Sequence, residues 1–172
     1  NQLLEVVQEN KLTHLPMFKG LDFIGNISEE DLIELSFENK TVDYTSYLEN
    51  FFLTDSSTLL DAIQMMYTNQ ANILPIINEH SKYIGSITEN DIINTFANFP
   101  FVSAEGVSML VSIAEKDLSI TAISNIIEAN NGKILGILIV GYKEDSAYVL
   151  LKFSSSNLLT IGETFERYGY QV

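Results

Sequence analysis

The sequence I-G-N-I-S-E-E-D at residues 24–31 returns as I-G-S-I-T-E-N-D at residues 84–91, an offset of 60 residues. A Leu-Pro pair precedes each copy, in K-L-T-H-L-P-M-F at residues 11–18 and in Q-A-N-I-L-P-I-I at residues 70–77. These upstream stretches are 59 residues apart, so the second copy has one extra residue in the turn that follows them. Repetition over this span indicates one folding unit that is present twice.

The second copy gives the order of elements in the unit: strand, helix, strand, strand, helix. Its apolar runs predict strands at residues 51–53, 73–77 and 83–87, a helix that starts at Thr58, and a helix over residues 89–98. The apolar side of the Thr58 helix is expected to be Leu59, Ile63, Met66 and Tyr67. The first copy begins inside the corresponding helix, at residue 1 or 2, and lacks its opening strand. The core side of that helix is expected to be Leu3, Leu4, Val6 and Val7.

A different domain is expected after the repeats, because Pro100 cannot continue the helix before it. The pattern predicts a β-α-β-β-α-β order, with elements near residues 107–114, 119–129, 134–142, 147–153, 156–168 and from Tyr170 onward. The isoleucines Ile120, Ile123, Ile126 and Ile127 recur at helical spacing. The sequence therefore predicts an α+β protein. Its expected segments are residues 1–39 (first repeat), 40–99 (linker and second repeat) and 101–172 (ferredoxin-like domain).

Composition excludes several classes of function. The net charge of −14 and the single arginine, Arg167, disfavour nucleic-acid binding. There is no cysteine, and two isolated histidines make a metal site improbable. The longest strongly apolar stretch is far below the roughly 20 residues that span a membrane. We therefore expect a cytoplasmic protein that is not an enzyme, since its polar residues form no catalytic constellation.

The twinned segment is the best candidate for ligand chemistry. Gly25 and Gly85 have no side chain, so backbone or ligand can approach them closely. Ser28 or Thr88 then starts a helix whose free N–H groups suit a polar or anionic ligand. Asp31 or Asp91, one turn later, could accept hydrogen bonds from the vicinal hydroxyls of a ribose. The alternative is that Ser-x-x-Asp and Thr-x-x-Asp are capping boxes without a ligand.

These residues resemble the cystathionine-β-synthase (CBS) domain, over residues 1 to about 98. CBS domains occur in tandem pairs with two clefts, and the resemblance implies a regulatory role with an adenosine-containing ligand such as AMP, ATP or S-adenosylmethionine. It implies one cleft formed by Thr88, Asp91, Asn72, Ile73, Leu74, Pro75 and Phe52. It implies another formed by Ser28, Asp31, Thr13, His14, Leu15 and Pro16. His14 is interpreted either as a structural histidine or as a ligand contact.

The charge of the repeats disfavours a triphosphate. Residues 1–98 hold four lysines against fifteen acidic residues, and phosphate tails are usually bound by Arg or Lys. We therefore expect a ligand of low charge, such as AMP, adenosine or S-adenosylmethionine, or an empty second cleft. Because Glu29 and Glu30 crowd the first copy, Thr88 to Asp91 is the preferred candidate.

The element order of residues 101–172 resembles the ACT domain, which binds amino acids at dimer interfaces. Here the effector-loop position holds E-K-D-L-S at residues 115–119, without the usual glycine, and Asp117 or Ser119 is expected to cap the helix. The whole arrangement is similar to acetoin-utilisation-type bacterial CBS proteins. From this similarity only the architecture is expected. A homodimer is expected because the ferredoxin-like sheet has edges to cover and CBS pairs often associate, and the CBS resemblance implies a regulated protein that the sequence does not name. The alternative function is a structural or protein-interaction module with unoccupied clefts.

Overall fold

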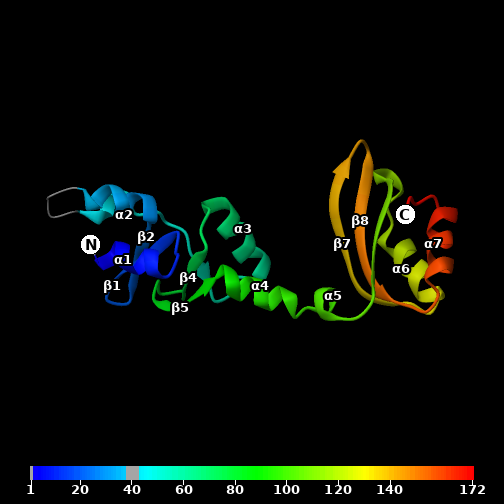
Figure 1. The fold of residues 1–172 in the computed structure, drawn as a ribbon, viewed down its shortest axis with the longest axis horizontal. Helices are drawn as coiled ribbons and strands as arrows, with labels where there is room; N and C mark the ends of the chain where they lie inside the picture. Colours follow the sequence, from blue (N-terminus) through cyan, green and yellow to red (C-terminus); the bar gives the residue numbers. More distant parts are fainter. Residues whose placement is uncertain (1, 38–42) are drawn as a thin grey trace. The chain divides into compact units, whose positions relative to one another are not determined.

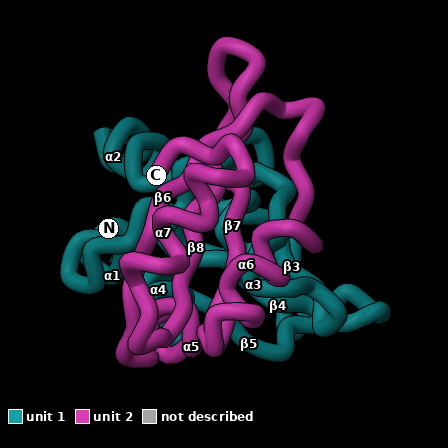
Figure 2. Tube along the Cα trace, turned by 90° about the vertical axis from the view of Figure 1, so that its right-hand side faces the viewer, with its two compact units in different colours: residues 1–95 teal, residues 96–172 magenta. Residues whose placement is uncertain are grey.

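The structure is a computed structural model that describes residues 2–37 and 43–172, and it divides into two compact units. Unit 1 comprises residues 1–95 and unit 2 residues 96–172 (Figures 1 and 2). The predicted boundary between residues 39 and 40, and the alternative helix start at residue 1, lie outside the described residues. The predicted α+β class is confirmed, since both units combine helices with mainly antiparallel sheets.

The first repeat consists of α1 (Gln2–Glu9), β1 (His14–Lys19), β2 (Asp22–Ser28) and α2 (Glu29–Ser36). Strands β1 and β2 form an antiparallel pair. A small core forms between this pair and the helices, from Val7, Ile27, Leu32 and Leu35. Leu3 and Leu4 pack against that core, as expected. The prediction for Val6 is wrong: it is 44% exposed, because the inward face of α1 follows the helical spacing of Leu3 and Val7.

The second repeat has the predicted order of elements. It contains β3 (Leu53–Thr54), α3 (Leu59–Asn69), β4 (Ile73–Ile77), β5 (Tyr83–Thr88) and α4 (Glu89–Ala97). Strand β3 lies slightly later than the predicted residues 51–53 and pairs in parallel with β4. In α3 the buried residues are Ala62 and Met66, whereas Ile63 is 40% exposed and Tyr67 80% exposed. The predicted apolar side of α3 is therefore confirmed for Met66 and for Leu59, which packs against the core, and is wrong for Ile63 and Tyr67.

The two repeats meet through equivalent parts of their chains. The β1–β2 turn pairs with the β4–β5 turn: Tyr83 N–H donates to Leu21 O at 3.0 Å, and Phe23 N–H donates to Ser81 O at 3.3 Å. Across the same junction Lys82 Nζ lies 2.6 Å from Asp22 Oδ1. The segment before β3 includes η1 (Tyr44–Tyr47) and pairs with β2. This segment, residues 43–52, is the linker between the repeats, and it therefore completes the first repeat.

Unit 2 has the predicted β-α-β-β-α order, but its predicted final strand is reduced to an isolated bridge. It contains α5 (Pro100–Ser103), β6 (Val107–Ala114), η2 (Glu115–Asp117), α6 (Ile120–Ala129), β7 (Lys133–Lys143), β8 (Ser146–Ser154) and α7 (Leu158–Arg167). The sheet order is β6-β8-β7, and the last strand is a single bridge between Gln171 and Ser112. Helices α6 and α7 cover one face of the sheet (Figure 1). Within unit 2, Phe101 of α5 lies against Gly136 of β7.

The core of unit 2 lies between that sheet face and the two helices. It includes Val111, Val149, Leu151 and Phe153 from the strands, and Ile123, Ile126, Ile127, Ile161 and Phe165 from the helices. Ser119 caps α6 by accepting from Ala122 N–H at 3.2 Å, while Asp117 lies in η2. The predicted helical spacing of the isoleucines is confirmed in α6, where Ile123, Ile126 and Ile127 are buried and Ile120, in the first turn, is 43% exposed. None of the helices in the described ranges is long and apolar enough to cross a bilayer.

Candidate functional site

In both copies of the twinned segment, the Ser or Thr before the helix and the Asp three residues later are hydrogen-bonded to each other and cap the helix. The Ser28 hydroxyl donates to Asp31 Oδ2 at 2.6 Å and accepts from Asp31 N–H at 3.0 Å. In the second copy the Thr88 hydroxyl donates to Asp91 Oδ2 at 2.6 Å, and Thr88 N–H donates to the same oxygen at 2.8 Å. These two donors, the hydroxyl foremost, lower the pKa of Asp91. The capping interpretation is therefore geometrically satisfied in both copies.

The twinned glycines have unequal surroundings. Gly25 has φ +142°, and a Cβ built on it would lie 2.7 Å from Leu48 Cβ and 3.2 Å from Glu49 O. Gly85 has no atom within 4 Å of the corresponding position. The predicted close approach therefore holds for Gly25, where the linker passes over β2. At Gly85 no backbone approaches closely, and the predicted approach of a ligand stays a prediction.

The first cleft lies where α2 begins and is lined by residues of both repeats. It encloses about 570 Å³. Its lining residues are Thr13, His14, Ser28, Glu29, Glu30, Asp31, Glu49, Thr68, Asn69 and Gln70. Four predicted residues are thus brought together: Thr13, His14, Ser28 and Asp31. The predicted Leu15 and Pro16 lie on β1 and are not among these lining residues.

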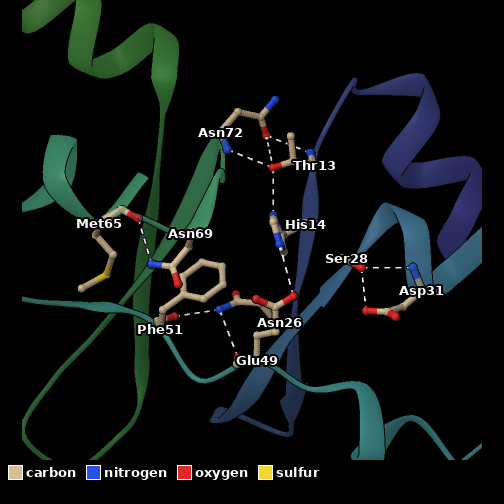
Figure 3. A network of polar contacts seen from close by, with 10 residues as sticks. All are labelled: Thr13, His14, Asn26, Ser28, Asp31, Glu49, Phe51, Met65, Asn69 and Asn72. Carbon is tan, nitrogen blue, oxygen red and sulfur yellow. Dashed lines mark hydrogen bonds and ion pairs between the residues drawn. The ribbon is translucent and has the colours of Figure 1, made fainter. Parts of the chain in front are cut away.

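His14 is buried in the wall of the first cleft, with only 6% of its surface exposed. Its Nδ1 lies 2.9 Å from Thr13 Oγ1 and its Nε2 lies 3.5 Å from Glu49 Oε1, as Figure 3 shows. Its ring packs edge-on against Phe51 at a centroid distance of 5.3 Å. Burial lowers the pKa of His14, and the nearby Glu49 carboxylate opposes that shift. His14 is therefore held structurally, as one interpretation expects, and it also lines the cleft, while its contact with a ligand stays a prediction.

Together with Thr68, Asn69 and Gln70, Glu49 is one of the cleft residues that local sequence patterns do not identify. It lies on the linker, where its N–H and C=O exchange hydrogen bonds of 2.8 Å with Asn26 of β2. The Asn26 side chain, fully buried, donates to Phe51 O at 2.7 Å. Its Oδ1 has no hydrogen-bond partner among the residues that the structure describes. The Glu49 carboxylate and the unpartnered Asn26 Oδ1 are therefore carried by two residues whose backbones are paired (Figure 3).

The second cleft, of about 680 Å³, adjoins the first. Its lining residues are Thr13, Met66, Tyr67, Thr68, Gln70, Ala71, Asn72 and Glu89, so it shares Thr13, Thr68 and Gln70 with the first cleft. Of the residues predicted for this site, only Asn72 lines it. The others, Thr88, Asp91, Ile73, Leu74, Pro75 and Phe52, lie elsewhere. Leu74 is fully buried in the core of the second repeat.

Thr13 and Asn72 connect the two clefts. Thr13 N–H donates to Asn72 Oδ1 at 2.9 Å, and Asn72 N–H donates to Thr13 Oγ1 at 2.9 Å (Figure 3). The amide of Asn72 also donates to Lys11 O at 2.7 Å. Because these polar atoms are already paired, Asn72 supports the junction of the repeats as well as lining a cleft. In the described part of the chain, no three acidic or histidine side chains group as metal ligands.

Comparison with known proteins identifies part of unit 1. Residues 47–98 match the family model described as "CBS domain". A Thermotoga maritima CBS domain pair/ACT domain protein is similar over 54% of this chain and 77% of its own, at 16% identity and a TM-score of 0.46. CBSX2, solved in complex with AMP, is similar over 55% and 78%, at 23% identity and a TM-score of 0.44. A second T. maritima CBS domain-containing protein is similar over 55% and 76%, at 14% identity and a TM-score of 0.46.

Proposed function

From the premise that residues 47–98 form a CBS domain, we propose that this protein is a regulatory sensor of an adenosine-containing small molecule. The observation that carries the proposal is the first cleft, where Ser28 and Asp31 of one repeat lie opposite Thr68 to Gln70 of the other. A ligand in such a cleft contacts both repeats. Its binding therefore biases how the repeats pack, which is the physical basis of a regulatory signal.

The residues of the first cleft suit a ribose better than a phosphate. Asp31 lines the cleft, and one of its carboxylate oxygens accepts the Ser28 hydroxyl. A ribose offers vicinal hydroxyls as donors to such a carboxylate. Phosphate oxygens are acceptors only, and they would meet Glu29 and Glu30 in the same turn of α2. These contacts support adenosine or another ligand of low charge over ATP.

The proposal is tested by calorimetry on the whole protein with adenosine, AMP, ADP, ATP and S-adenosylmethionine. We expect heat with at least one ligand of low charge, and loss of that heat in Asp31→Ala. Asp91→Ala is the matched comparison, because Asp91 makes the equivalent cap but does not line either cleft. Silence of all five ligands would refute a sensor of adenosine compounds.

The alternative, an interaction module with unoccupied clefts, is favoured by one observation. In both helix caps the hydroxyl donates to the aspartate of the same cap, so neither cap requires a ligand. Under this alternative the aspartates serve only to start helices, and nucleosides leave the melting temperature unchanged. A thermal-shift screen of nucleosides, nucleotides and amino acids separates the two functions. Catalysis is not part of either proposal.

Unit 2 is proposed to act as an ACT-like partner of the sensor, with a second effector and a homodimer interface. Its β-α-β-β-α order and the closing bridge at Gln171 support the ACT resemblance. Strand β7 is the outer strand of the sheet, and an unpaired outer strand favours association with another chain. Light scattering after size exclusion measures the oligomeric state, and the amino-acid arm of the thermal-shift screen tests the effector.

A further inference from the structure

We infer that Glu49 determines which ligand charge the first cleft accepts, so that the cleft selects a nucleoside with a cationic 5′ substituent and rejects the corresponding phosphate. The inference rests on the proposed function, because it assumes that a nucleoside enters this cleft. It goes further by assigning the choice among nucleosides to one carboxylate on the linker.

The position of Glu49 is fixed by its backbone and by its neighbour across the strand. It exchanges two hydrogen bonds of 2.8 Å with Asn26, whose side chain is anchored on Phe51 O. The absence of a side chain at Gly25 lets this linker segment approach β2. The Glu49 side chain itself is 44% exposed and lines the cleft. Its carboxylate is therefore held at the cleft wall and remains accessible to a ligand.

The negative charge of Glu49 is not cancelled by its partner. His14 lies 3.5 Å away, but burial lowers the pKa of the imidazole and favours its neutral form. A neutral imidazole carries one ring proton and no net charge, whether that proton lies at Nδ1, 2.9 Å from Thr13 Oγ1, or at Nε2, 3.5 Å from Glu49 Oε1. Neither lysine nor arginine occurs among the described residues that line the cleft. The charge of Glu49 is therefore available to a ligand.

The other charged groups of the cleft have the same sign. Glu29, Glu30 and Asp31 occupy the first turn of α2, so four carboxylates face an incoming ligand. An ammonium group supplies up to three N–H donors and a positive charge, whereas a phosphate supplies further acceptors and negative charge. The surplus of acceptors favours the cation.

The second cleft provides an internal comparison. Glu89 is the one carboxylate among its described lining residues, and Glu49 does not line it. A charge preference that originates at Glu49 should therefore be seen at the first cleft and not at the second. Amide chemical shifts separate the two locations, since residues 28–31 line only the first cleft and Glu89 lines only the second.

The test uses three probes that differ only at the 5′ position: adenosine, AMP and 5′-amino-5′-deoxyadenosine. Calorimetry on the whole protein should give an affinity for the amine at least about 10-fold above that for AMP, with adenosine between them. Raising the salt from about 50 mM to about 500 mM should narrow this ratio, because exposed charges are screened. NMR titration should locate the amine at residues 28–31.

Glu49→Gln is the variant that isolates the charge, because a glutamine carbonyl can still accept from His14. It should raise the affinity for AMP and lower that for the amine, which narrows their ratio by about 3-fold or more. Glu79→Gln is the matched control: it removes the same charge from a side chain that is 85% exposed and lines neither cleft. The control should keep the wild-type ratio.

Two results would overturn the inference while leaving the proposed function intact. In the first, AMP perturbs residues 28–31 and binds there as tightly as the amine in the wild-type protein, a comparison that needs no variant. In the second, a folded Glu49→Gln keeps the wild-type ratio. If none of the three probes binds, the proposed function fails and the inference fails with it.

Discussion

Thr13 and Asn72 occupy equivalent positions of the two repeats, and each donates its backbone N–H to the side chain of the other at 2.9 Å. The chain continues symmetrically from this pair. The N–H of Glu29 donates to Thr13 O at 2.8 Å, and that of Glu89 donates to Asn72 O at 2.9 Å. The duplication has thus placed two copies of one position against each other.

The reciprocal contact predicts strong coupling between Thr13 and Asn72. Asn72→Ala leaves the part-buried Thr13 N–H without its acceptor, which costs roughly 1–3 kcal/mol, and it also removes the exposed hydrogen bond to Lys11 O. Thr13→Ala leaves the Asn72 N–H without its acceptor, and both substitutions remove the 3.2 Å hydrogen bond from the Thr13 hydroxyl to Asn72 Oδ1. The free energy of unfolding of both single variants and the double variant should give an interaction energy of about 0.5–3 kcal/mol. If the free-energy changes of the two single variants add up to that of the double variant, the two residues are not coupled and the prediction is wrong.

Substitution by alanine should destabilise the protein at Gly25 and leave its stability almost unchanged at Gly85. Gly25→Ala places a side chain at positive φ against Leu48 and Glu49 O, and we expect a loss of about 1–3 kcal/mol in stability. Gly85→Ala meets open space, so its effect should stay within about 0.5 kcal/mol. Chemical denaturation measures both. Equal effects would show that the contact at Gly25 does not form.

The buried His14 predicts a loss of stability at mildly acidic pH. Its pKa is lowered in the folded protein, so between that pKa and about 6.5 the unfolded chain binds more protons. This contribution to stability is present above pH 6.5 and is lost as pH falls through the folded pKa. For one proton the slope stays below about 1.4 kcal/mol per pH unit. Denaturation between pH 7.5 and 5.5 measures it, at values where ordinary carboxyl groups remain ionised.

His14→Gln should flatten this dependence, because it removes the buried imidazole. The matched control is His80→Gln, which removes the other histidine from an exposed turn. A slope that survives in His14→Gln would locate the proton uptake elsewhere.

The contact between Phe101 and Gly136 tests the packing of unit 2. A Cβ at position 136 would lie 2.2 Å from Phe101 Cδ2, so Gly136→Ala should displace the ring at a cost of about 1–3 kcal/mol. In a Phe101→Ala background the same substitution should cost much less, because the obstructing ring is gone. Thermal denaturation of the four proteins measures the difference. A cost that is independent of residue 101 would mean that the ring does not pack there.

Much of the fold could be predicted because its signals are local. The strand at residues 107–114 has the predicted bounds, and the hairpin strands and the capping residues Ser28 and Ser119 follow from turn and capping chemistry. Burial was harder to predict: Val6, Ile63, Tyr67 and Ile120 are apolar but exposed. Their periodicity defines an apolar side, but the position of the neighbouring elements decides which residues are covered. The predicted domain boundaries, ligand and dimer stay predictions.

The candidate site could be predicted only within each repeat. Thr13, His14, Ser28 and Asp31 meet as expected from one copy of the repeat. Glu49 and the stretch from Thr68 to Gln70 reach the first cleft from parts of the chain that carry no motif. For Thr68 to Gln70 the duplication is a signal, because a symmetric pair of repeats brings one copy's turn to the other copy's cleft. For Glu49 only the pairing with Asn26 places it.

That pairing also sets an order of events during synthesis. Asn26 is made 23 residues before Glu49 and 25 before Phe51, both of which it contacts. At about 5–20 residues per second, the ribosome adds Glu49 and Phe51 more than one second after Asn26. Until then the outer edge of β2 is unpaired and available to other chains. The nascent protein therefore depends on continued elongation, since its first repeat acquires this backbone pairing only when residues 49–51 emerge.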